Sequence, residues 1–379
     1  MTSIDMAGYL LGLGRPNLPA AVPSPTGAPG PLGGATLGED IKGIDAAKVT
    51  AWFDANIPGA TGPLAFDLIA GGHSNLTYGV RDAAGHHYVL RRPPLGHVLA
   101  TAHDMTREHK IISALGPTDV PVAPALGLCT DDSVNGAPFY VMQFVDGQVL
   151  RDAAAANAIS TEARRNAGLS VADTLARIHA VDPDAVGLGD LGKKDGYIER
   201  QLKRWYSQFQ QSQTRELATV DEVHDALRSR IPEQGRASIV HGDYRLDNCM
   251  TDADGNIIAV LDWEICTLGD PLADVGLLMV YWTEASDSHP MLLTAPTTTD
   301  GFLSRKEVLD RYAEASGRDL SHIDFYIAFG YWKLACIVEG VYARYVGGAM
   351  GSDASGFEGF AVQVERCAQA AADAVARLG

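Results

Sequence analysis

The loop that follows the apolar segment Ser238–Val240 constrains the fold more than any other part of the sequence. This loop reads His241-Gly-Asp-Tyr-Arg-Leu-Asp-Asn248, and a second apolar segment, Ile257–Leu261, is followed at once by Asp262. Between them, a turn rich in Asp, Gly and Asn predicts a hairpin over Met250–Leu261. Two polar clusters, each at the end of an apolar strand, are therefore expected to meet at one end of this hairpin.

The spacing of these polar residues is typical of a kinase catalytic loop and its metal-binding aspartate. Asn248 lies five residues after Asp243, and Asp262 lies 19 residues after it. Phosphoryl transfer needs a carboxylate that orients the attacking hydroxyl and accepts its proton. It also needs hard oxygen ligands, such as Asn and Asp, that hold Mg²⁺ against the ATP phosphates. Because both residue types occur at this spacing, we expect phosphotransferase chemistry.

Three motifs together carry a resemblance to a known family: His241–Asn248, Leu261-Asp-Trp-Glu264 and Gly269-Asp-Pro-Leu-Ala-Asp274. On these motifs the chain resembles the aminoglycoside phosphotransferase/choline kinase family over most of its length. The segments Tyr88–Pro94 and Trp332–Arg344 are similar to the branch whose kinase-like domain is fused to some acyl-CoA dehydrogenases.

The resemblance implies an α+β fold of the bilobal protein-kinase-like type. A small antiparallel-sheet N-lobe would bind nucleotide, and a larger, mainly helical C-lobe would carry the catalytic loop, the metal site and the acceptor site. The resemblance also implies ATP and Mg²⁺ as cofactors and these roles in the C-lobe: catalytic base, Asp243; brace of the loop, His241; Mg²⁺ ligands, Asn248 and Asp262; anchors of the lobe, Asp270 and Asp274.

The N-lobe supplies candidate phosphate ligands. The turn Gly71–Asn75 lies between two predicted strands, and its backbone N–H groups can cradle phosphates together with Ser74 and Asn75. Strand alternation places Val89 and Arg91 on one face of the next strand. Arg91 therefore takes the place where kinases keep a phosphate-binding Lys, and Arg92 remains the alternative.

Two further N-lobe elements complete the predicted nucleotide site. Glu108, on a helix expected over Thr101–Leu115, is the proposed ion-pair partner of Arg91. The strand Pro138–Val145 resembles the hinge that pairs with adenine, with Gln143 to Val145 offering N–H and C=O groups.

The sequence divides into three parts by composition. Residues 1–44 form a Gly/Pro-rich N-terminal extension that is expected to be extended and disordered. Residues 45–145 alternate like strands around one prominent helix and form the expected N-lobe, and residues 146–379 form the mainly helical C-lobe.

Charge and cysteine content exclude several classes of protein. The formal charge of −17, from 30 Lys and Arg against 47 Asp and Glu, argues against a nucleic-acid partner. Five cysteines without a C-x-x-C pair argue against a disulfide framework and favour the cytoplasm. The longest apolar stretch, Phe325–Val346, contains three charged residues and predicts a buried helix rather than a membrane span.

The acceptor stays open at this stage, and so does the oligomeric state. A small-molecule hydroxyl is expected, in an aminoglycoside, an amino alcohol or a hydroxyacyl thioester. Lys333 and Arg344 would suit an anionic acceptor, whereas Glu284, Asp287 and Glu339 would suit a cationic one. A catalytically weak or inactive nucleotide-binding module of the same fold is the alternative, because Arg replaces the usual Lys on the phosphate-binding strand.

Overall fold

The computed structural model describes residues 41–70, 75–95, 104–287, 295–348 and 358–378. These residues form two compact units that divide between Gln148 and Val149, close to the expected lobe boundary. Nearly all of the predicted N-terminal extension lies outside the described residues, and so does Ser74.

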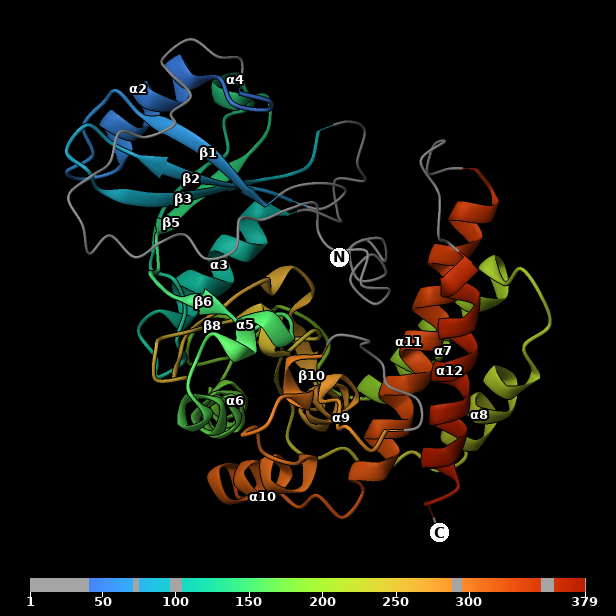
Figure 1. The fold of residues 1–379 in the computed structure, drawn as a ribbon. Helices are drawn as coiled ribbons and strands as arrows, with labels where there is room; N and C mark the ends of the chain where they lie inside the picture. The colour runs from blue at the N-terminus through green and yellow to red at the C-terminus, as the bar shows by residue number, and fades with distance from the viewer. Residues whose placement is uncertain (1–40, 71–74, 96–103, 288–294, 349–357, 379) are drawn as a thin grey trace. The chain divides into compact units, whose positions relative to one another are not determined.

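A five-stranded antiparallel sheet forms the N-terminal unit (Figure 1). In the order in which they pair, its strands are β1 (Ala65–Ala70), β2 (Leu76–Arg81), β3 (His87–Arg92), β5 (Phe139–Gln143) and β4 (Ala125–Cys129). Strand β3 contains Val89 and Arg91, which the sequence placed on one face of a strand. The edge strand β4 was not predicted, because its sequence Ala-Leu-Gly-Leu-Cys has no β-branched or aromatic residue.

The two faces of this sheet pack against different helices. Val49 and Phe53 of α2 (Ala46–Asn56) form a core with Tyr78, Tyr88 and Leu90 on one face. The helix α3 (Met105–Leu115) contacts β4 and β5. Since side chains alternate along a strand, neighbouring residues of β3 point to opposite sides of the sheet.

The C-terminal unit is mainly helical. It comprises α5 (Ala153–Asn157), α6 (Thr161–Ala180), α7 (Tyr197–Ser212), α8 (Ala218–Arg228), α9 (Leu272–Tyr281), α10 (Arg305–Ser316), α11 (Ile323–Val346) and α12 (Glu358–Val375). The helix α11 contacts α7, α8, α9 and α12 and is buried over most of its length, which confirms the predicted buried helix. Among the described helices, none has the length and apolarity that a bilayer crossing requires.

Short strands carry the polar motifs of this unit. The strand β7 (Ser238–Val240) pairs with β10 (Thr267–Gly269), and β8 (Cys249–Thr251) forms the predicted hairpin with β9 (Ile257–Val260). Gly255 turns the hairpin at a φ of +84°, and a Cβ there would lie 2.0 Å from the carbonyl oxygen of Ala163. Only glycine therefore allows the hairpin tip to rest against α6.

Candidate active site

The predicted catalytic loop leaves β7 and is buried from its first residue. The carboxylate of Asp243 is 1% exposed, and its Oδ2 accepts a hydrogen bond of 2.9 Å from Asn248 Nδ2. The same amide nitrogen donates to the backbone oxygen of Asp243 at 2.8 Å. With both bonds made by the nitrogen, the amide oxygen of Asn248 is turned away from the carboxylate and is available to a cation.

Asp274 holds the start of this loop from α9. Its two carboxylate oxygens accept the backbone N–H groups of His241 at 2.7 Å and Gly242 at 2.8 Å. His179 Nε2 lies 3.3 Å from one of these oxygens. Burial would raise the pKa of Asp274, but its hydrogen bonds and the charges of His179 and His241 outweigh burial and lower it.

The hairpin brings Asp262 to the loop through backbone contacts. The N–H of Leu261 donates to the carbonyl of Asn248 at 2.8 Å. The ring of His241 links the same two segments, because its Nδ1 accepts the N–H of Asp243 at 3.3 Å and its Nε2 donates to the carbonyl of Leu261 at 2.9 Å. The proposed brace therefore bonds both to the peptide of the proposed base and to the residue before Asp262.

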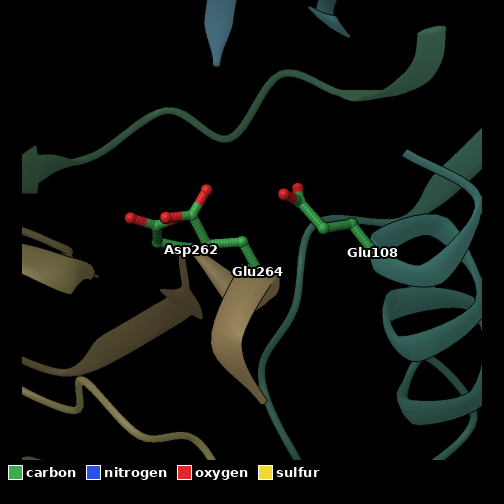
Figure 2. A group of neighbouring side chains, drawn as sticks. All are labelled: Glu108, Asp262 and Glu264. Carbon is green, nitrogen blue, oxygen red and sulfur yellow. The ribbon is translucent and has the colours of Figure 1, made fainter. Parts of the chain in front are cut away.

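Asp262 has an unusual backbone. Its φ is +64°, and it is the one non-glycine residue with positive φ in the part of the chain that the structure describes. An Asp in this region costs of order 1 kcal/mol and persists where the surroundings impose it. The geometry turns the chain sharply, so that Asp262 and Glu264 emerge from the same turn, as Figure 2 shows.

Glu264 is a candidate metal ligand that the sequence analysis left without a role. Its carboxylate and that of Asp262 offer ligand oxygens within 4.8 Å of each other. The amide oxygen of Asn248 belongs to the same loop-and-hairpin element. Hard oxygen donors of this kind suit Mg²⁺, which takes few protein ligands and keeps waters or phosphate oxygens. The Glu in Asp-Trp-Glu was the signal that could have identified it.

The surroundings of Asp243 raise its pKa above the usual value. Burial raises its pKa, Arg245 and His241 oppose the rise, and Asp247 and Asp262 add to it. Oδ1 of Asp243 is buried and has no hydrogen-bond donor among the described residues. Among the described residues, one acceptor atom of the buried carboxylate is therefore left without a donor, which a bound ligand can supply.

Arg245 is a second residue that the sequence analysis left unassigned. Its Nε lies 3.5 Å from Asp243 Oδ2, and its Nη2 lies 3.2 Å from Asp247 Oδ2. The guanidinium carbon lies 4.8 Å from the ring centroid of Tyr281 on α9. Arg245 is thus held on two sides next to the proposed base.

In the N-terminal unit, Glu108 contacts two of the predicted phosphate-site residues. Arg91 Nε lies 3.0 Å from Glu108 Oε2, and Asn75 Nδ2 donates to Glu108 Oε1 at 2.9 Å. The hydroxyl of Tyr140 also donates to Oε2, at 2.9 Å. Glu108 is 2% exposed and comes from α3, where Figure 2 labels it. Arg91, on the α3 side of the sheet, keeps 13% of its side chain exposed.

Arg92 points to the other face of the sheet, where its guanidinium donates hydrogen bonds to backbone carbonyls. Its Nη1 donates to the backbone carbonyls of Gly43 and Asn135, and its Nε donates to that of Pro93. It is 5% exposed. Of the two arginines between which the sequence left the phosphate contact open, Arg91 is the one whose surroundings suit a ligand.

The backbone N–H groups of the predicted hinge differ in whether the unit itself already hydrogen-bonds them. The N–H of Gln143 donates to the carbonyl of Pro124 at 2.9 Å, and the N–H of Phe144 donates to that of His87 at 3.4 Å. The N–H of Gln143 is therefore already hydrogen-bonded within its own unit. Val145 lies two residues after the end of β5 and is the remaining candidate amide of the predicted hinge.

Comparison with known proteins identifies the family. The profile of the phosphotransferase enzyme family matches residues 66–325. The chain belongs to this family. Acyl-CoA dehydrogenase family member 10 from Mus musculus is 34% identical over 299 residues, which cover 77% of the present chain and 28% of the mouse protein. The chain thus spans less than a third of that relative.

Solved structures confirm the predicted kinase-like fold. A Ralstonia eutropha protein, described as a candidate aminoglycoside phosphotransferase, is 32% identical with a TM-score of 0.77 and covers 88% of this chain and 99% of its own. A thermostable mutant of an aminoglycoside phosphotransferase, crystallised with AMP-PNP and hygromycin B, shares the fold at 17% identity and a TM-score of 0.57. That comparison covers 88% of this chain and 100% of the mutant. This phosphotransferase is therefore α+β, with the antiparallel sheet in one unit and the helices in the other.

Proposed function

We propose that this phosphotransferase moves the γ-phosphoryl group of ATP to a hydroxyl of a small molecule, with Mg²⁺ as its metal. The observation that carries the proposal is the free Oδ1 of Asp243 among the described residues. A buried carboxylate oxygen without a donor is costly unless a ligand supplies one. A hydroxyl group supplies that donor and, in the same contact, presents the proton that the reaction must remove.

In the C-terminal unit each polar residue has a distinct task. Asp243 Oδ1 orients the acceptor hydroxyl and takes its proton, while Asn248 and Arg245 hold Oδ2. Asn248, Asp262 and Glu264 would hold Mg²⁺, which neutralises phosphate charge when it is bound. His241 fixes the backbone between these ligands and the base.

In the N-terminal unit the proposed nucleotide contacts are Arg91, Asn75, Ser74 and the hinge. Glu108 orients the Arg91 guanidinium, and the side chain of Arg91 would contact phosphate oxygens. Asn75 would share this task with Ser74. The carbonyl of Gln143 and the N–H of Val145 would pair with adenine.

Replacement of Asp243 by Asn tests the proposal. Asp243→Asn keeps the shape of the side chain but cannot accept a proton, so we expect kcat to fall by about a thousandfold or more. Stabilisation by Mg·ATP in a thermal-shift titration should persist. Normal turnover in the variant would disprove the role of Asp243.

Asp254→Asn is the matched control. Asp254 lies at the exposed tip of the hairpin that follows the Asp243 loop, so the substitution removes the same charge from a nearby segment of the chain. We expect wild-type turnover, and a loss as large as that of Asp243→Asn would point to a general charge effect.

For the acceptor, we propose a hydroxyacyl thioester ahead of an aminoglycoside or an amino alcohol. The support is the mouse relative, an acyl-CoA dehydrogenase family member that is 34% identical over 77% of this chain. ADP release should be measured across 3-hydroxyacyl-CoA, choline and hygromycin B. Turnover confined to hygromycin B would contradict this choice.

The alternative is a nucleotide-binding module without turnover, which the Arg91 substitution for Lys favours. Thermal stabilisation by Mg·ATP without ADP release from any acceptor would support it. A cytoplasmic location also remains a proposal, supported by five buried cysteines that are all free thiols.

A further inference from the structure

Lys333 is a buried cation that the proposed mechanism has not used. It lies in the middle of α11, 8% exposed, in a segment where nearly every neighbour in sequence is apolar and buried. A buried ammonium group is costly, and proteins normally place a carboxylate against it. No carboxylate lies within ion-pair distance of its Nζ among the described residues, so its partners must explain why it is there.

The first partner of Lys333 is the peptide group that precedes the proposed base. Its Nζ donates to the carbonyl of Gly242 at 3.3 Å. The N–H of this peptide belongs to Asp243 and donates to His241 Nδ1, also at 3.3 Å. Lys333 and His241 therefore hold the two polar ends of one peptide plane, and that plane sets the direction of the Asp243 side chain.

The second partner of Lys333 is an aromatic ring. Its Nζ lies 5.8 Å from the ring centroid of Trp205 on α7. The guanidinium carbon of Arg204 lies 5.1 Å from the same ring. Two cations thus share one aromatic ring, and neither has an ion-pair partner in the part of the chain that the structure describes.

The carboxylates near the cluster of Lys333, Arg204 and Trp205 already accept hydrogen bonds from other groups. Asp274 is bonded to the loop amides, and Glu339 accepts Thr214 and Arg215. Asp221 accepts the hydroxyl of Tyr206. Burial lowers the pKa of Lys333, the charges of Asp243 and Asp274 oppose this shift, and Arg204 adds to it. Lys333 and Arg204 thus place two cations next to one aromatic ring, in a chain of net charge −17.

We propose that Lys333 selects the acceptor by charge, favouring a neutral or anionic hydroxyl compound over a cationic one. This inference rests on the proposed function, because it concerns the acceptor of the same base. A cationic amino alcohol brought to Asp243 approaches the Lys333 ammonium group, which donates to the carbonyl of the adjacent residue Gly242, and like charges repel. Lys333 also acts as a positioning residue, since it holds the Gly242–Asp243 peptide.

Choline and 3,3-dimethylbutan-1-ol are the probes for this test. They have the same shape and the same hydroxyl, but only choline is charged. We expect wild-type kcat/KM to favour the neutral compound by about tenfold or more, and Lys333→Met to reduce the preference to less than about threefold. Met matches the length of Lys and suits a buried site, and Lys333→Arg should restore the preference.

Two further variants keep the result interpretable. Arg204→Gln removes an exposed cation of the same cluster, so it should fold and reduce the preference in the same direction by a smaller factor. Lys306→Met removes an exposed lysine from α10, where it pairs with Asp310, and should leave the preference unchanged. An unchanged preference in folded Lys333→Met, or a wild-type preference for choline, would overturn the inference.

Failure of the proposed function is distinguishable from failure of this inference. If the wild-type protein phosphorylates no acceptor, the kinase proposal fails by itself. The affinities of choline and 3,3-dimethylbutan-1-ol for the Mg·ATP-loaded protein are then compared by calorimetry. Tighter binding of the neutral compound that is lost in Lys333→Met supports the charge selection, whereas equal affinity, or no binding of either compound, contradicts it.

Discussion

Asp243 and Asp274 are two buried carboxylates of the C-terminal unit whose surroundings are opposite. Asp274 accepts two backbone amides and faces His179. Asp243 accepts Asn248 at Oδ2 only, and its Oδ1 lacks a donor among the described residues. Burial pushes the pKa of both upward, yet the pKa of Asp274 is lowered and that of Asp243 is raised.

The difference separates a structural carboxylate from the one that we propose as the base. Asp274 has donors on both oxygens, so its negative charge is stabilised in the folded state and ties α9 to the loop. Among the described residues, Asp243 has a hydrogen-bond donor on Oδ2 but not on Oδ1, so a ligand can donate a hydrogen bond to Oδ1. Burial alone does not distinguish the two roles; the count of donors does.

Asp274→Asn is expected to have the largest effect on stability. The amide places an N–H₂ group against backbone N–H donors and removes the charge that they stabilise, at a cost of about 3 kcal/mol in the free energy of unfolding. Urea denaturation at pH 7 measures it. Asp243→Asn should cost nothing or stabilise, and an equal loss in both variants would remove the distinction drawn above.

The pH dependence of the same two variants sharpens the comparison. The pKa of Asp274 is lower in the folded state than its usual 3.8, so its contribution is complete above pH 3.8 and is lost as the pH falls below that value. The pKa of Asp243 is higher in the folded state, so it destabilises at neutral pH, and stability is regained as the pH falls through this raised pKa. The cost of Asp274→Asn should therefore shrink in acid, and the gain from Asp243→Asn should vanish there.

Glu108→Gln tests a third buried carboxylate, in the other unit. Glu108 accepts hydrogen bonds from Asn75 and Tyr140, so we expect Glu108→Gln to lower the unfolding free energy by about 2 kcal/mol. Because Glu108 also orients Arg91, we expect weaker ATP binding as well. Denaturation and calorimetry measure the two effects. Asp67→Asn on β1 is the control, because Asp67 is 61% exposed and its nearest cation is 3.9 Å away. Unchanged ATP affinity would assign Glu108 a structural role only.

The smallest effect on stability is expected at Asp262. Asp262→Gly relieves the positive φ and should raise the unfolding free energy of the metal-free protein by about 0.5 kcal/mol while abolishing Mg²⁺-dependent turnover. Asp262→Ala removes the same carboxylate but keeps the backbone strain, so it is the matched control. Equal stability of the Gly and Ala variants would show that the backbone at this position is not strained.

Local sequence patterns predicted the elements that carry the site. The hairpin over Met250–Leu261 follows from two apolar segments and a turn, and the structure confirms it with β8 and β9. Alternation along β3 placed Arg91 and Arg92 on opposite faces. These predictions succeed because neighbours in sequence decide them.

Other features depended on residues distant in sequence. The structure shows that Arg92 is occupied by carbonyls from Gly43 and Asn135, and that the Gln143 amide is taken by Pro124. The edge strand β4 pairs only because β5 offers it a partner. No local pattern reveals such partners, because each lies on a separate segment of the chain.

Sequence alone identified a kinase-like phosphotransferase, because the spacing of Asp243, Asn248 and Asp262 is a property of one continuous segment. Tertiary structure alone decided which groups surround that segment. Asp274 reaches the loop from 32 residues away and Lys333 from 91, as their bonds to Gly242 indicate. The physical reason is that a polar group's free energy depends on its partners in space, and folding brings those partners from segments that the motif does not contain.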